Sequence, residues 1–335
     1  MNTKWLTLTK KRRIEILNQA TELTGLPSVA IEKDWWVTLA LKASFSLPYS
    51  KYIVFKGGTS LSKGWNLIDR FSEDIDLAID RKFFGFEGDI SKTQIKNLRK
   101  QSCEFISMAF LDDLTKVLTE WKAIDACNLI AQPVKDSDIH PQVIEIYYNS
   151  VIDISAYLPQ RVLIEVSSRS LMEPIEEIKI NSILNDNFLQ QIFGTAPFKI
   201  PTVLPQRTFL EKVFLLHEEF SQDVDKIRID RLSRHLYDLE KLMDTEHGMA
   251  ALKNTDLYNN IIAHREKFNP LRGLDYANHI PSKISIVPPD GVLKDYERDY
   301  ETMTSFMIYG EPIKFMNLLK RILELQTRIN GISLP

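Results

Sequence analysis

The chain has 335 residues, with 42 Lys or Arg against 45 Asp or Glu and a formal net charge of −3. With 44% hydrophobic and 26% charged residues, it has the composition of a globular protein, which excludes bulk disorder and collagen-like architecture. The balanced charge excludes a surface that is basic all over, and the two cysteines exclude a four-cysteine zinc site.

Hydrophobic periodicity predicts a mixed α/β N-terminal half and a helical C-terminal half, with the boundary near Ile200. The expected N-terminal elements are a helical region over 1–47, strands over 52–55, 74–79, 143–148, 162–166 and 178–183, and helices over 59–67 and 91–118. The expected C-terminal helices cover 205–220, 230–243, 255–268 and 301–329. No signal-peptide pattern or apolar run of about 18 residues occurs, so we expect a cytoplasmic protein that does not cross a membrane.

The most informative stretch is a glycine pair followed by two aspartates. Gly57-Gly58 directly follows a predicted strand, where a helix N-terminus with Thr59 and Ser60 would offer donors to a phosphate. Asp74 and Asp76 are two residues apart on a strand, so both carboxylates lie on one face and can share a divalent cation such as Mg²⁺. Singly, the glycines also fit a tight turn and the aspartates a solvated strand face. Together, they indicate nucleotidyl transfer.

Several further residues carry two interpretations. Glu165 interrupts an apolar strand, so it meets either a metal ion or an arginine, Arg161 or Arg169. Lys212 flanks an apolar helical stripe and is either an interface lysine or a side chain that reaches a pocket. One of the neighbouring Trp35 and Trp36 is expected in the core, while the other is free to cap a base.

A later helix is predicted to present basic residues on one face together with Asp238. Arg231, Arg234, His235 and Lys241 recur at three- and four-residue spacing around it. One interpretation is an exposed network in which the arginines pair with Asp230, Glu240 and Asp244. The other is a surface that contacts phosphate or RNA, with Asp238 orienting Lys212 or a basic neighbour.

These stretches resemble the AbiEii/AbiGii toxin family of nucleotidyltransferases, within the DNA polymerase β-like superfamily. The matching sequences are EKDWWV at 32–37, FKGGTSLSK at 55–63, RFSEDIDL at 70–77, RTFLEKVFLLH at 207–217 and RHLYDLEKL at 234–242. The resemblance implies an α+β fold, with a mixed-sheet nucleotidyltransferase core over 1–200 and a helical domain over 201–335. In one departure from the superfamily pattern, the gap between Thr59 and Asp74 is a few residues longer than usual, with the insertion around Gly64-Trp65-Asn66.

The resemblance also implies roles for individual residues. Gly57, Gly58, Thr59 and Ser60 match the nucleotide-cradling motif, Asp74 and Asp76 the metal-binding pair, Glu165 the third carboxylate, Lys212 the second-motif lysine, and Asp238 with Lys241 the late motif. We expect Mg²⁺ as cofactor, an NTP as substrate, the 3′ end of a tRNA as acceptor, with Arg231 and Arg234 as RNA contacts, and a cognate antitoxin in a toxin–antitoxin or phage-defence system. The alternatives are a protein or small-molecule acceptor, and a non-catalytic module that binds nucleotide or antitoxin.

Overall fold

The computed structural model describes residues 2–133, 142–153, 158–271, 273–308 and 311–333. The chain divides into two compact units. The first comprises residues 1–64 and 71–203, and the second comprises residues 65–70 and 204–335. The short segment Trp65–Arg70, between the glycine pair and the aspartate pair, therefore belongs to the second unit. The insertion that we expect around Gly64-Trp65-Asn66 overlaps the start of this segment.

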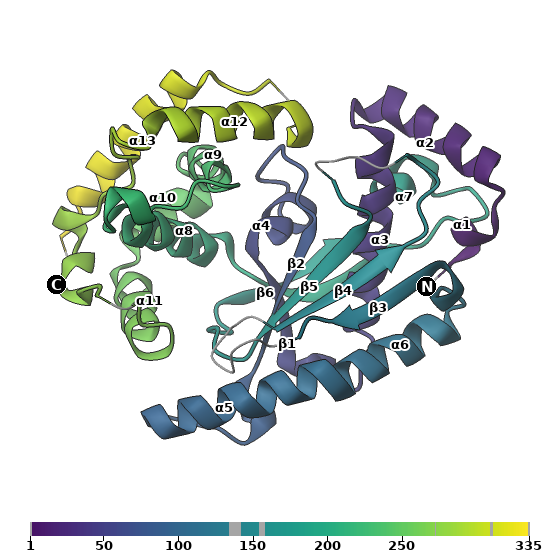
Figure 1. Ribbon diagram of the computed structural model, residues 1–335, viewed down its shortest axis with the longest axis horizontal. Coiled ribbons are helices and arrows are strands. Elements are labelled where there is room, and N and C mark those ends of the chain that lie inside the picture. Colours follow the sequence, from purple (N-terminus) through teal and green to yellow (C-terminus); the bar gives the residue numbers. More distant parts are fainter. Residues whose placement is uncertain (1, 134–141, 154–157, 272, 309–310, 334–335) are drawn as a thin grey trace. The chain divides into compact units, whose positions relative to one another are not determined.

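Within the described residues, the first unit contains one seven-stranded mixed sheet in the order β3-β4-β5-β2-β1-β7-β6 (Figure 1). The strands are β1 (Ile53–Lys56), β2 (Asp74–Ile79), β3 (Cys127–Ala131), β4 (Gln142–Tyr148), β5 (Arg161–Ser167), β6 (Ile175–Ile180) and β7 (Phe198–Val203). The pairs β2–β5 and β1–β7 are parallel, whereas the others are antiparallel. The expected mixed sheet of an α+β fold is therefore confirmed.

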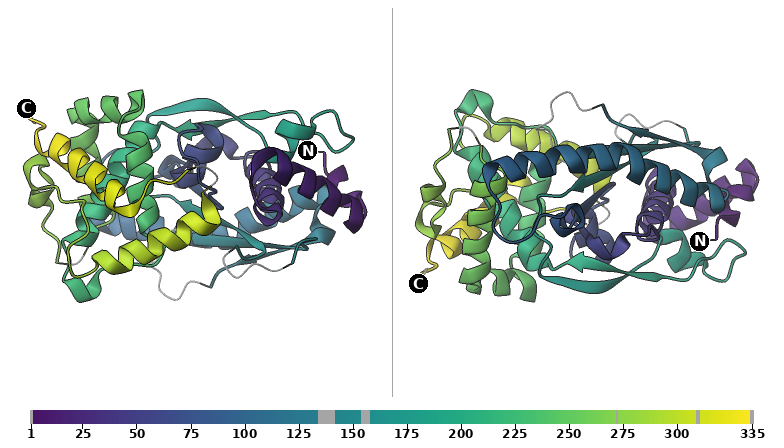
Figure 2. Two further views of the ribbon diagram at one scale, coloured as in Figure 1. Left: turned by 90° about the horizontal axis from the view of Figure 1, so that it is seen from above. Right: turned by 90° about the horizontal axis from the view of Figure 1, so that it is seen from below.

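Helices of the first unit bury one face of this sheet. The helices of this unit are α1 (Lys4–Thr7), α2 (Lys10–Thr24), α3 (Ser28–Ser44), α4 (Gly57–Thr59), α5 (Lys92–Phe105), α6 (Leu111–Glu120) and α7 (Ile183–Phe188), with π-helical turns at Ser60–Gly64 and Ile106–Phe110. Figure 1 and the right-hand view of Figure 2 show α5 and α6 as one nearly continuous rod. Ile75 and Leu77 of β2 and Ile164 of β5 point into the core that α3 and α6 cover. Since side chains alternate along a strand, Asp74, Asp76 and Glu165 lie on the opposite face.

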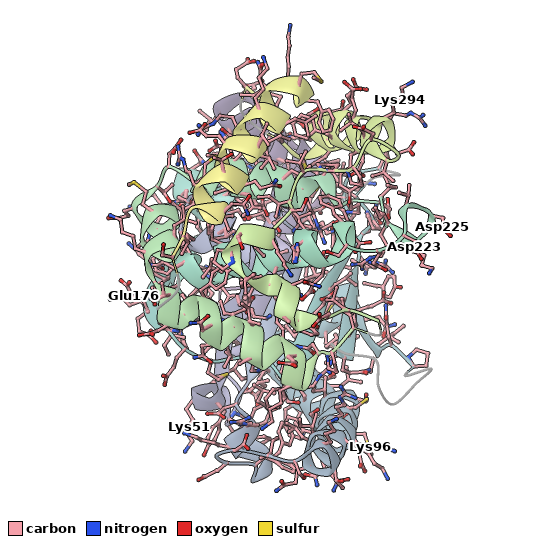
Figure 3. All side chains as sticks on the ribbon, turned by 90° about the vertical axis from the view of Figure 1, so that its left-hand side faces the viewer. Lys51, Lys96, Glu176, Asp223, Asp225 and Lys294 are labelled. Carbon is pink, nitrogen blue, oxygen red and sulfur yellow. The ribbon has the colours of Figure 1, made fainter. Side chains whose placement is uncertain are left out.

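The second unit is helical. Its helices are α8 (Pro205–Phe220), α9 (Ser233–Leu242), α10 (Glu246–Lys253), α11 (Thr255–Phe268), α12 (Leu293–Met307) and α13 (Phe315–Asn330). α8 packs against α9, α10 and α11, and α9 packs against α12 and α13. Charged side chains such as Asp223, Asp225 and Lys294 extend outward at its margin (Figure 3).

Several predicted boundaries are wrong. The helix expected over 59–67 begins at Gly57 and ends at Gly64, and the helix expected over 301–329 is two helices, α12 and α13. The N-terminal helical region breaks into three helices. In addition, β3, α7, β7 and α10 were not predicted. No helix in the described part of the chain is long and apolar enough to span a membrane.

Candidate nucleotidyltransferase site

The turn after β1 is built so tightly that only glycine fits at its first position. Gly57 has a φ of +80°, and a Cβ on it would lie 1.9 Å from Oδ2 of Asp76. Because the Asp76 carboxylate lies directly against this turn and the backbone angle is positive, no residue with a side chain fits at Gly57. The fold thus brings the glycine motif and the aspartate motif into contact.

The hydroxyls of Thr59 and Ser60 stabilise this turn from within. Thr59 is 1% exposed, and its Oγ1 donates to the backbone oxygen of Asp74 and lies 2.8 Å from Ser72 Oγ. Ser60 is fully buried and its Oγ donates to the backbone oxygen of Gly57 at 2.8 Å. These contacts tie the turn to the start of β2. The expected direct contact of both hydroxyls with a nucleotide stays a prediction.

The carboxylates of the first unit lie on adjacent strands in matching register. Asp76 is opposite Lys56 on β1 and opposite Glu165 on β5. Asp74 lies two residues earlier on the same face, and all three acids are half-buried. Because adjacent strands are about 4.8 Å apart, these carboxylates concentrate negative charge on one side of the sheet.

This donor set suits a hard cation. Among the residues that the structure describes, no three His, Cys, Asp or Glu side chains converge tightly enough to hold a metal by themselves. Mg²⁺, however, usually binds one or two carboxylates together with substrate phosphates. The oxygen donors of Asp74 and Asp76, beside a turn into which no Cβ fits, match that arrangement. For Glu165, the metal and ion-pair interpretations both stay open, although Arg161 forms its ion pair at 2.6 Å with Glu145.

A second cluster of charged side chains lies inside the helical unit. Asp238 is fully buried and accepts hydrogen bonds from Arg70 Nε at 2.7 Å and Arg70 Nη2 at 2.8 Å. The Nζ of Lys212 is 2.9 Å from Asp238 Oδ2 and 3.2 Å from Nδ1 of His235. Lys212, at 7% exposure, is therefore held by Asp238, as one of the two interpretations of the sequence expected.

Burial and charge act together on these groups. Burial tends to raise the pKa of Asp238, but the nearby Arg70 and Lys212 outweigh it and hold that pKa well below its usual range. Burial, with the charge of Arg70, lowers the pKa of Lys212. Burial and the charge of Lys212 lower the pKa of His235, so its ring stays neutral at pH 7. Asp238 is therefore the ionised partner that Arg70 and Lys212 share in this cluster.

The basic residues around α9 are arranged differently from the prediction. Arg231 lies before the helix with a φ of +59°, so it does not share the helical face of Arg234. Its backbone N–H donates to Asp299 Oδ1 at 2.8 Å, and Ser233 N donates to Asp299 Oδ2 at 2.9 Å. The Asp299 carboxylate on α12 therefore binds the start of α9. Lys241, near the end of α9, donates to Asp69 at 3.0 Å.

Two of the acids that we expected to pair with the arginines of α9 have other partners. Asp244 lies 2.7 Å from Arg328 on α13, and Glu240 lies 3.8 Å from Arg321 on the same helix. Two of the acids proposed as partners for the α9 arginines thus pair with the C-terminal helix.

Both adjacent tryptophans belong to the core. Trp35 is fully buried and Trp36 is 1% exposed. Trp36 stacks on Tyr148, with ring centroids 5.1 Å apart. The proposed capping of a base by one of them is wrong, because neither ring reaches the surface of its unit.

Comparison with known protein families identifies the family of this chain. The profile of the family described as nucleotidyl transferase AbiEii toxin, type IV toxin–antitoxin system, matches residues 40–321. The chain belongs to the AbiEii family. It is therefore a nucleotidyltransferase of the toxin type, and the resemblance of its motifs to this family is confirmed.

One solved structure supports the fold of this AbiEii-family chain. The chain is similar to MenT4, a nucleotidyltransferase toxin of Mycobacterium tuberculosis H37Rv, with a TM-score of 0.52 and 16% identity, over 97% of this chain and 91% of that one. It also matches JHP933 of Helicobacter pylori with a TM-score of 0.35 and 15% identity, over 91% of this chain and 98% of that one. No curated protein sequence matches the chain.

Two contributors to the site were missed by sequence reasoning. Arg70 lies within the motif RFSEDIDL and Lys33 within EKDWWV, but neither motif predicts a role for these two residues. Both are buried cations with acidic partners far away in the sequence, Asp238 and Glu73. The sequence carries no signal that singles out these pairs, because a buried acid needs a cation but many Lys and Arg residues of the chain could supply it.

Proposed function

We propose that this AbiEii-family enzyme transfers a nucleoside monophosphate from an NTP to the 3′ end of a tRNA, in a Mg²⁺-dependent reaction, and thereby blocks translation. The observation that carries the proposal is the contact between the glycine turn and Asp76, which lies in register with Glu165 and shares its face with Asp74. A Gly-Gly turn, which carries no side chain at its first two positions, beside paired carboxylates provides the groups that nucleotidyl transfer requires.

The reaction breaks one bond and forms one. The 3′-hydroxyl oxygen of the acceptor attacks the α-phosphorus, the bond from that phosphorus to the bridging oxygen breaks, pyrophosphate leaves, and the hydroxyl proton passes to solvent. Bound Mg²⁺ would supply positive charge to the acceptor oxygen and to the leaving group. Asp74 and Asp76 would hold it, with Glu165 as a third carboxylate, and the turn at Gly57-Gly58 would accept the phosphates at close range.

We assign Lys212 and Asp238 to the same reaction. Lys212 would place its charge on the triphosphate, with Asp238 as a positioning residue that holds the amine. The chain links this cluster to the acid pair, because Arg70, which binds Asp238, precedes Asp74 by four residues. Lys241 would serve as a further phosphate contact, and Arg231 with Arg234 would contact the RNA backbone.

The choice of acceptor rests on the family resemblance and is the part most in need of a test. A protein side chain or a small molecule would use the same chemistry. The purified protein should be incubated with total RNA, total protein and each labelled NTP in Mg²⁺. We expect label in the tRNA fraction, at the 3′ end. Label in protein, or in neither fraction, would overturn the tRNA assignment.

The biological setting follows from the family. AbiEii-family toxins belong to type IV toxin–antitoxin systems, so we propose a cognate antitoxin as partner and a role in phage defence. Co-expression with a neighbouring antitoxin gene should restore growth of cells that the toxin arrests. Growth arrest that persists with every neighbouring gene would count against this partner.

A further inference from the structure

Helix α3 carries three consecutive charged residues that are all buried. Glu32 is 0%, Lys33 1% and Asp34 5% exposed, in a helix that is otherwise largely apolar. Charged side chains are rarely buried without partners, because leaving water is costly. Each of the three has a partner from a different segment of the first unit, and two of those segments belong to the proposed nucleotide site.

Lys33 connects the starts of the two acid-bearing strands. Its Nζ forms an ion pair with Glu73, which is 4% exposed and immediately precedes Asp74. The same Nζ donates to the backbone oxygen of Pro159 at 2.8 Å, two residues before β5 begins. β2 carries Asp74 and Asp76, and β5 carries Glu165, so one ammonium group holds both strands where they begin.

Asp34 holds the far side of the glycine turn. Its Oδ1 lies 2.5 Å from Lys63 Nζ, in the π-helical turn that continues from Gly57-Gly58. Its Oδ2 accepts from the backbone N–H of Ile183 at 2.7 Å. Both side chains of the Asp34–Lys63 pair are at least nine-tenths buried, so solvent screens the pair little.

Glu32 binds a different part of the first unit. It accepts from the backbone N–H of Val151 at 3.0 Å and from the hydroxyl of Ser150, beyond the end of β4. It is as buried as its two neighbours on the helix and equally polar, but its hydrogen bonds go to a connection and not to the turn or the acids. It is therefore an internal reference for the effect of disturbing a buried charge on α3.

We propose that Lys33 and Asp34 are positioning residues that fix the glycine turn and the acid strands relative to one another. The proposal rests on the proposed function, in that the turn binds the NTP and the acids bind Mg²⁺. The tolerance of the site is small, because the Asp76 carboxylate already fills the space beside Gly57. A displacement of about 1 Å between the two motifs is enough to impair catalysis strongly.

The test compares near-isosteric variants along α3. Asp34→Asn keeps the shape and an acceptor for Ile183, but it removes the charge that attracts Lys63. Lys33→Met combined with Glu73→Gln removes both charges of the other pair, so no buried charge is left alone. Glu32→Gln is the matched control. Thermal unfolding identifies the folded variants, and Asp34→Asn decides the outcome if the double variant does not fold.

Two readouts separate positioning from general stability. The first is amide hydrogen exchange of residues 57–64 and 72–76, which requires neither metal nor NTP. The second is kcat and the Mg²⁺ concentration for half-maximal transfer. We expect Asp34→Asn and Lys33→Met/Glu73→Gln to exchange faster in those segments and to lose about 10- to 100-fold in kcat or apparent Mg²⁺ affinity, as mutations of residues that orient metal ligands do. Glu32→Gln should show faster exchange only near 150–152 and change these kinetic values less than about twofold.

The outcomes are distinct. If Asp34→Asn and the double variant match Glu32→Gln in both exchange and Mg²⁺ dependence, the positioning role is wrong. If the wild-type protein transfers no nucleotide, the proposed function is wrong. If amide exchange at 57–64 and 72–76 is nevertheless faster in Asp34→Asn and in the double variant than in wild type, the coupling of α3 to the two motifs stands.

Discussion

Arg70 binds Asp238 with two parallel hydrogen bonds, from Nε at 2.7 Å and Nη2 at 2.8 Å, inside the helical unit. Arg70 belongs to the motif RFSEDIDL and is the last residue of the segment 65–70, which is part of the second unit. The residues that follow it, Phe71–Ile79, belong to the first unit. The late Asp-x-x-Lys motif and the aspartate-pair motif are therefore joined by a buried ion pair and four residues of chain. Changes at Asp238 should consequently affect both stability and catalysis.

The buried Asp238 should make stability depend on acid pH. Its pKa in the folded protein lies below the value of about 3.9 for an unfolded chain, so its contribution to stability is present above that value and is lost as pH falls through the folded pKa. Asp238→Asn should cost about 3–5 kcal/mol at pH 7, since two buried cations lose their partner. Urea unfolding of both proteins between pH 2.5 and 7 should show this difference shrinking below about pH 4. A difference that is constant with pH would contradict the assigned ionisation.

The glycine turn offers a prediction with a close control. Gly57 has φ +80° with Asp76 beside it, while Gly85 has φ +79° with nothing within 4 Å of its Cβ position. Gly57→Ala and Gly85→Ala should each lose about 1–2 kcal/mol from backbone strain. Only Gly57→Ala should also displace Asp76 and abolish transfer of labelled NTP. Equal activity of the two variants would show that the contact between Gly57 and Asp76 has no role in catalysis.

How far the sequence alone predicts this protein depends on the range of the interaction involved. The turn and the acid pair follow from local spacing, and both are present, with β2 at the predicted residues. By contrast, the predicted boundary near Ile200 falls inside β7, because this strand contains Pro201, a residue that is uncommon inside a sheet. The sequence also gives no means of pairing Lys33 with Glu73 or Arg70 with Asp238, because 40 and 168 residues separate them and only the folded chain brings them together.

The acid pair should be required for stabilisation by the metal. Asp74→Asn/Asp76→Asn keeps the shape of both side chains but removes the two charges that would attract Mg²⁺. The variant should therefore lose nucleotidyl transfer and the increase in melting temperature that Mg²⁺ with a non-hydrolysable NTP produces in wild type. Transfer of labelled NTP measures the first effect, and thermal shift with and without EDTA measures the second. An unchanged Mg²⁺-dependent shift in the variant would place the metal elsewhere.

Lys212 should matter more for turnover than for folding. Lys212→Met keeps the apolar stem of this buried side chain and leaves Asp238 paired with Arg70. We therefore expect a stability change below about 2 kcal/mol and a loss of about 100-fold in kcat, the size seen when one transition-state donor is removed. Lys116→Met, at an exposed ion pair with Asp113, provides the control. A Lys212→Met enzyme with wild-type kcat would remove this lysine from the reaction.

The RNA-contact role of Arg231 and Arg234 is tested by charge reversal. Arg231 precedes α9 and Arg234 lies on its first turn, so the two guanidinium groups come from different local structures near the start of this helix. Phosphate contacts make binding fall with salt, by a slope that counts the contacts. Arg231→Glu/Arg234→Glu should weaken tRNA binding and reduce the salt slope by roughly one to two contacts, while NTP binding persists. Lys253→Glu/Lys294→Glu reverses two exposed charges of the same unit and serves as the matched control. Filter binding of tRNA across a salt series gives both slopes. If the arginine variant and the lysine variant show the same slope, binding responds only to the overall charge of the protein, and the start of α9 is not part of the acceptor site.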